Sequence, residues 1–166
     1  MNNKLLIVGT MAYDAIETPF GKVEKILGGA ATYIGLSASQ FLVDSAIISV
    51  VGEDFDMQHL QLLKEKNLDL SGVEIVKGGE TFFWSGRYNE DLNTRTTLET
   101  RLNVLENFNP IIPDQFRSPD IVVLGNLSPE VQIKALEQLK RSPTLIILDT
   151  MNFWMDHSRS HLDEVI

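Results

Sequence analysis

The chain has 166 residues, of which 43% are hydrophobic and 22% charged, values typical of one globular domain with an ordinary core. Its formal net charge of -9 disfavours a protein that binds the phosphate backbone of nucleic acids. The absence of cysteine excludes disulfides and thiolate metal sites, and no apolar run approaches the roughly 20 residues of a membrane span. The apolar run after Lys4 is too short for a signal peptide, so these features favour a cytoplasmic protein.

Runs of apolar residues predict the strands of one sheet. Four continuous runs are typical of buried parallel strands, at residues 5–9, 46–51, 121–125 and 145–149. A shorter strand is predicted at residues 73–76. Helices are predicted in between, at residues 30–43, 57–66 and 128–140. Asp54 or Asp56 is expected to cap the second helix, and Ser128 the third.

Two segments break this alternation of strands and helices. Residues 12–27 alternate polar and apolar side chains around a turn at 19–21, which predicts an exposed hairpin. Residues 80–104 are rich in aromatic residues and threonine, which predicts a second hairpin. The predicted fold is therefore a single α/β domain: a three-layer α/β/α (Rossmann-like) sandwich with a mainly parallel sheet, and a small β-sheet lid built from the two hairpins.

Gly28 and Gly29 stand where the first hairpin ends and a helix of small residues begins. Because glycine has no Cβ, the backbone can approach a ligand closely there, and the first N–H groups of the helix have no partner within it. Polar loops follow four of the predicted strands, at residues 9–14, 52–54, 125–126 and 149–152. Since these loops meet at one edge of a parallel sheet, we expect a site for an oxygen-rich small molecule at that edge.

In this order the features resemble the ribokinase-like (PfkB) family of sugar and nucleoside kinases. The matching features are Asp14 after the first strand, Gly28-Gly29 opening a helix, Val51-Gly52-Glu53-Asp54-Phe55, the β insertion, and Asp149-Thr150-Met151-Asn152. The resemblance covers only the N-terminal half of the family's domain. The family's Gly-Ala-Gly-Asp loop, which carries the catalytic base, is not in this sequence. We therefore expect a truncated chain that holds no catalytic residue.

The resemblance implies ATP-dependent phosphorylation of a sugar or nucleoside hydroxyl. ATP and Mg²⁺ would then be bound mainly by the half that this chain lacks, and the 166-residue chain alone would be inactive. The resemblance also implies a homodimer of the complete protein, joined through the β lid, with Trp84 at the contact.

On the acceptor side, Asp14 resembles the residue that accepts hydrogen bonds from the substrate's hydroxyls, and Gly28 and Gly29 resemble the diglycine against which the sugar lies. Tyr33 stands where the family often has asparagine, which suggests an acceptor other than a simple ribokinase-type sugar. The resemblance and the lid position add four further candidate substrate-binding residues, Arg87, Asn126, Asp149 and Asn152.

Several alternatives stay open. The chain could instead be a non-catalytic module that binds a ligand or dimerises through the same edge, whereas a dinucleotide-binding domain is disfavoured because the glycine fingerprint is absent. Glu53 and Asp54 could simply be acidic residues favoured at a helix N-terminus. His157 and His161 are spaced to share one helical face, and a solvated face is a better interpretation than a metal site. The sequence does not name the phosphate acceptor.

Overall fold

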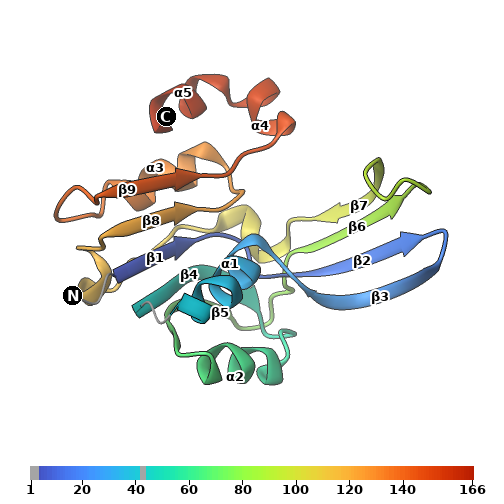
Figure 1. Ribbon diagram of the computed structural model, residues 1–166, viewed down its shortest axis with the longest axis horizontal. Coiled ribbons are helices and arrows are strands. Elements are labelled where there is room, and N and C mark those ends of the chain that lie inside the picture. Colours follow the sequence, from blue (N-terminus) through green and yellow to red (C-terminus); the bar gives the residue numbers. More distant parts are fainter. Residues whose placement is uncertain (1–3, 42–43) are drawn as a thin grey trace.

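The computed structural model describes residues 4–41 and 44–166, and it contains two separate β-sheets (Figure 1). The main sheet has five strands, and all its neighbouring strands pair in parallel. Across this sheet the order is β5 (Leu68–Val76), β4 (Asp44–Gly52), β1 (Lys4–Val8), β8 (Ile121–Leu124) and β9 (Leu145–Leu148). The predicted α/β fold with a mainly parallel sheet is confirmed.

Helices cover both faces of the main sheet because successive strand residues point to opposite faces. One face packs on α1 (Ala30–Ala38) and α2 (Met57–Glu65), with Leu5 and Ile7 in the shared core. The other face carries Leu6 and Val8, and it packs on α3 (Pro129–Leu136) and on the connection between the second sheet and β8. The remaining elements are α4 (Asn152–His157), α5 (Arg159–Val165) and 3-10 turns at Ser39–Phe41, Asn103–Asn107 and Asp114–Phe116.

Some predicted boundaries differ from those of the structure. The helix predicted at 30–43 ends at Ala38 and continues as a 3-10 turn, and its predicted end at Val43 lies outside the described residues. The third helix ends at Leu136 rather than near residue 140, and its predicted cap, Ser128, accepts a hydrogen bond from the Val131 N–H. The strand predicted at 73–76 is the second half of a longer strand, β5.

The strand predicted at residues 145–149 is present as β9, but the prediction that it is buried is wrong. In β9, Leu145, Ile146 and Ile147 are each 44–48% exposed, although their sequence is wholly apolar. The physical reason is the position of β9 at the edge of the main sheet, where it pairs only with β8 among the described residues.

The second sheet is built from the two predicted hairpins and projects away from the main sheet (Figure 1). Its order is β3 (Gly21–Gly28), β2 (Ala12–Thr18), β6 (Phe83–Tyr88) and β7 (Arg95–Arg101). Each hairpin is antiparallel, and the two hairpins join through parallel pairing of β2 with β6. Residues far apart in the sequence, such as Asp14 and Trp84, thereby become direct neighbours.

Candidate functional site

Thr10 links the end of β1 to the beginning of α1. Its hydroxyl oxygen accepts a hydrogen bond from the Ala30 N–H at 3.0 Å, and its carbonyl accepts one from the Ala31 N–H at 2.9 Å. The expectation that the first N–H groups of this helix face a ligand is therefore wrong for these two. Gly29 has a φ of 95°, and a Cβ there would overlap with the Thr10 carbonyl, so this glycine is required for close backbone approach.

Asp14 lies in β2, with its carboxylate against the α-carbon of Gly28. The side chain is half-buried, and it makes no hydrogen bond or ion pair with any residue in the described ranges 4–41 and 44–166. Burial raises the pKa of the Asp14 carboxyl to about 6, because the charged form loses solvation without gaining a partner. The Asp14 carboxylate is thus a hydrogen-bond acceptor with two free oxygens at the junction of the two sheets.

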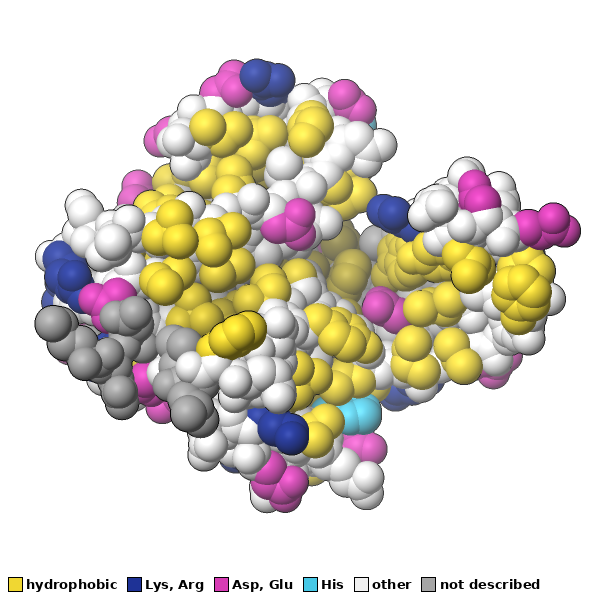
Figure 2. Space-filling view, in the orientation of Figure 1, with side chains coloured by type: hydrophobic (Ala, Val, Ile, Leu, Met, Phe, Trp, Pro, Cys, Tyr) yellow, Lys and Arg dark blue, Asp and Glu magenta, His cyan; other side chains and the backbone are white. Residues whose placement is uncertain are grey.

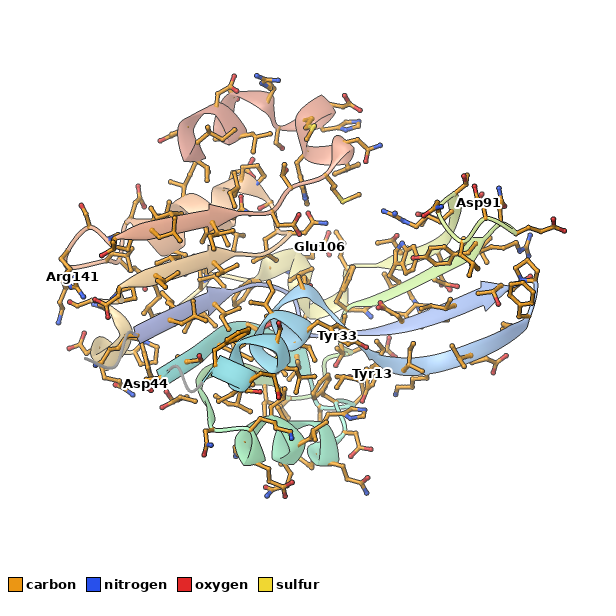
Figure 3. All side chains as sticks on the ribbon, in the orientation of Figure 1. Tyr13, Tyr33, Asp44, Asp91, Glu106 and Arg141 are labelled. Carbon is orange, nitrogen blue, oxygen red and sulfur yellow. The ribbon has the colours of Figure 1, made fainter. Side chains whose placement is uncertain are left out.

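Tyr33 lies beside this junction, on the end of α1 that faces the second sheet (Figure 3). Its hydroxyl donates a hydrogen bond to the Leu27 carbonyl at 2.8 Å, which fixes the ring next to the diglycine. The residue is nevertheless 56% exposed, so most of the ring is open to a ligand. The structure thus brings together Asp14, Gly28, Gly29 and Tyr33.

Asn126, Asp149 and Asn152 follow β8 and β9 at the carboxyl edge of the main sheet. The side chain of Asn126 is engaged in the fold: its amide contacts the Met151 sulfur at 3.1 Å, and its carbonyl accepts from the Trp154 indole N–H at 2.8 Å. Asp149 and Asn152 are exposed. Within the described part of the chain, no recorded contact joins these three side chains to Asp14.

Arg87 and Trp84 lie on β6. The Arg87 guanidinium forms a two-pronged ion pair with Glu17, with distances of 2.8 and 3.3 Å, and is exposed. Trp84 is the direct partner of Asp14 across the β2–β6 pair, its ring lies over Gly86, and its indole N–H points at the Thr97 hydroxyl at 3.4 Å. Figure 2 shows the surface hollowed between the main body and the projecting second sheet.

Comparison with known proteins gives this arrangement a family context. No family model matches the chain. A cytidine kinase from Thermococcus kodakarensis is 29% identical over 137 residues, which cover 82% of this chain and 48% of that protein. The solved nucleoside kinase of Methanocaldococcus jannaschii, an archaeal member of the ribokinase family, superposes with a TM-score of 0.76 at 22% identity, covering 99% of this chain and 57% of that one.

The chain has a ribokinase-like fold. A further solved structure, the Burkholderia thailandensis nucleoside kinase in complex with inosine, superposes with a TM-score of 0.74 at 15% identity, covering 97% of this chain and 56% of that one. The resemblance to ribokinase-like (PfkB) kinases predicted from the sequence is confirmed. The chain spans about half the length of these relatives.

In this ribokinase-like chain the two C-terminal histidines do not share a helix. Ser158 separates α4 from α5, the His157 Nδ1 atom lies 2.9 Å from the Phe153 carbonyl, and the His161 Nδ1 atom lies 2.9 Å from a Glu130 oxygen. In residues 4–41 and 44–166 no group of three or more His, Asp or Glu side chains could hold a metal ion. No helix among the described residues is long and apolar enough to cross a membrane.

The polar loop predicted after β4 is present, but the role of Asp54 in it was not predicted. Neither Glu53 nor Asp54 lies in the first turn of α2, and of the two predicted caps it is Asp56 whose carboxylate accepts from the Gln58 N–H at 2.8 Å. Asp54 instead accepts two hydrogen bonds from Thr81, 27 residues away. No local sequence signal announces a pair that is so distant along the chain.

Proposed function

We propose that this chain forms the acceptor-binding part of a kinase that transfers phosphate from ATP to a hydroxyl of a nucleoside or sugar. The observation that carries the proposal is the half-buried Asp14 carboxylate, which lies over Gly28 without a protein donor. The similarity to a cytidine kinase and to two nucleoside kinases supports it and favours a nucleoside as acceptor.

An ionised carboxylate only accepts hydrogen bonds, and its two oxygens can accept one from each of two adjacent hydroxyls. A ribose offers such a pair. In the proposal Asp14 holds that pair, Gly28 and Gly29 let the sugar approach the backbone, and the fixed ring of Tyr33 bounds the site. Binding of two donors would also lower the pKa of Asp14 from about 6, because hydrogen bonds stabilise the charged form.

The other four candidate residues would act less directly on the acceptor. Asp149 and Asn152 are exposed and free to meet a ligand that spans the edge of the sheet. Asn126 contributes by holding α4 through Trp154, and Arg87 would reach an acceptor only after leaving its ion pair with Glu17.

In this proposal ATP and Mg²⁺ are bound mainly by the half of a ribokinase-like domain that this chain does not span. Mg²⁺ would supply charge neutralisation on the transferred phosphate. The residues of this chain would bind and orient the acceptor, and the second sheet would exclude water from it. We place such an ATP-dependent enzyme in the cytoplasm, and we expect the 166-residue chain alone not to transfer phosphate.

We also propose that the complete protein is a homodimer joined through the second sheet. All seven residues of β7 are exposed, and the sheet projects from the body (Figure 1). A thin four-stranded sheet gains stability when a second layer covers one of its faces. A second copy of the same sheet would supply that layer.

The test is calorimetric titration of the native protein with cytidine, inosine and ribose, and separately with an ATP analogue. We expect one nucleoside to bind, and Asp14→Ala to weaken that binding by roughly 2–4 kcal/mol while nucleotide binding stays the same. Glu24→Ala, in the same hairpin and paired with the exposed Lys22, is the control and should bind as the wild type does. An acceptor affinity unaffected by Asp14→Ala would remove Asp14 from the site, and absence of phosphate transfer by the native protein would favour a non-catalytic module.

A further inference from the structure

The loop between β4 and α2 contacts two strands of the second sheet, β2 and β3, and the segment that leads into β6, and all three contacts involve Asp54. Thr81, two residues before β6, donates to one Asp54 oxygen from both its N–H and its hydroxyl, each at 2.7 Å. Lys25 of β3 lies 3.9 Å from the other Asp54 oxygen. Tyr13 of β2 donates to the Asp54 carbonyl at 3.4 Å and accepts from the Asp56 N–H at 2.8 Å.

Two of the side chains in these contacts are buried, whereas Asp54 itself and Lys25 are exposed. Thr81 is 2% exposed and Tyr13 is 3% exposed, so loss of these contacts would leave polar groups of buried residues without their partners. The Thr81 hydroxyl oxygen also accepts from the Gly52 N–H at 3.0 Å, which ties the end of β4 into the same set of bonds. Lys25 adds a cation over the Tyr13 ring, with its Nζ atom 4.0 Å from the ring centre.

The same contacts lie next to Asp14 in the second sheet. Asp14 follows Tyr13 directly in β2, so their side chains point to opposite faces of the second sheet. Its partner across the sheet is Trp84 of β6, the strand that Thr81 leads into. A second sheet that tilted away from the loop would carry Asp14 and Gly28 together away from α1 and the main sheet, since both residues belong to the second sheet.

We propose that Asp54 is a positioning residue for the acceptor site: its side chain holds β3 and the segment that leads into β6 to the loop after β4, beside the main-chain contact of that loop with β2, and thereby sets the orientation of the second sheet and the place of Asp14. The link to an acceptor rests on the proposed function, whereas the link to the orientation of the sheet does not. Asp54 itself touches no reacting group in this proposal.

The experiment compares Asp54→Ala, Asp54→Asn and Thr81→Val in the native protein with Glu53→Gln as the matched control. Glu53 is the acidic residue next to Asp54, and Glu53→Gln removes one negative charge from the same loop. Its carboxylate accepts a hydrogen bond from the exposed Gly78 N–H at 2.9 Å. Hydrogen exchange measured by mass spectrometry reports each sheet separately. Steady-state kinetics or calorimetric titration measures the KM or the Kd of the phosphate acceptor.

We expect Asp54→Ala to speed exchange in β2, β3 and β6 at least about 10-fold, with β1, β4 and β8 unchanged. The acceptor KM should rise about 10-fold or more, the KM for ATP should stay the same, and Thr81→Val should act in the same direction. Asp54→Asn keeps an oxygen for Thr81 and should fall between Asp54→Ala and the wild type.

Two results would overturn the proposal. Exchange in the second sheet that is unchanged in Asp54→Ala and Thr81→Val would show that Asp54 does not hold that sheet. Equal effects of Asp54→Ala and Glu53→Gln would show that only the loop's charge matters. If the wild type binds no acceptor, the proposed function fails, and the exchange measurement still decides whether Asp54 orients the sheet.

Discussion

The Asp14 carboxylate occupies the space that a Cβ on Gly28 would fill. This relationship joins two features that the sequence places 14 residues apart, an acid in one strand of a hairpin and a glycine at the end of the other. The contact explains why residue 28 is a glycine without reference to any ligand. It also leaves Asp14 half-buried in a strand, whereas the sequence predicted an exposed hairpin.

Replacement of Gly28 by alanine should displace the Asp14 carboxylate, because the new methyl group would overlap with it. We expect Gly28→Ala to destabilise the fold by roughly 1–3 kcal/mol and to weaken acceptor binding. Gly21→Ala, in the same hairpin with open space around its Cα, is the control. In a double-mutant cycle by denaturant unfolding, Gly28→Ala should cost less on the Asp14→Ala background. Strict additivity would contradict the overlap.

The raised pKa of Asp14 predicts how stability depends on pH. With a folded-state pKa of about 6, above the ordinary 3.8, the folded state holds this proton more tightly than the unfolded state does. Stability due to this group is therefore present at low pH and falls as pH rises from about 4 to about 6.

Asp14→Asn, which cannot ionise, should accordingly be more stable than the wild type by roughly 1–2 kcal/mol at pH 7, allowing for solvent screening of a half-buried group. The gain should vanish below about pH 4. Thermal unfolding across this pH range is the measurement. Asp91→Asn is the control, because hydrogen bonds from Thr94 and Asn93 lower the pKa of Asp91 and its removal should bring no gain at pH 7. Equal stability of Asp14→Asn and wild type at pH 7 would contradict the burial argument.

Acceptor binding should depend on the same proton. If the hydroxyls of the acceptor donate to an ionised Asp14, affinity should be nearly constant above pH 7 and should fall below about pH 6, approaching tenfold per pH unit. Titration of the acceptor between pH 5 and pH 8 measures this. The Asp14→Asn variant should bind weakly at every pH and lose the dependence. A pH profile shared by wild type and variant would assign it to another group.

The proposed dimer predicts a specific effect of Trp84. Its ring lies over Gly86 on the face of the second sheet that also carries Asp14. Trp84→Ser should shift the complete protein toward monomer and raise the acceptor KM, because a second sheet that is less well supported covers the acceptor less well. Sedimentation at matched concentrations is the measurement, with Phe41→Ser, an exposed aromatic residue in the 3-10 turn after α1, as the control. A wild type that is monomeric at tens of micromolar, or a variant dimer of unchanged affinity, would exclude this contact.

Much of the fold could be predicted because its signals are local. The strands at residues 5–9 and 46–51 were recognisable because a parallel strand with helices on both sides is apolar at nearly every position. The caps at Asp56 and Ser128 follow from side chains that reach only two or three residues ahead. The hairpins follow from alternation and from turn residues. The diglycine predicted a close approach of the backbone to a ligand, and in the structure Gly29 approaches the Thr10 carbonyl.

The sequence by itself therefore determined the strands of the main sheet, the two hairpins and the place of the diglycine. Tertiary structure alone decided that Thr10 takes the first N–H groups of α1, that Asn126 is engaged by Trp154, and that β9 is exposed. It also decided that Asp54 holds Thr81 and that Asp14 is left half-buried without a donor. Such facts depend on which residues meet across long separations, and no periodicity of a single segment encodes that meeting.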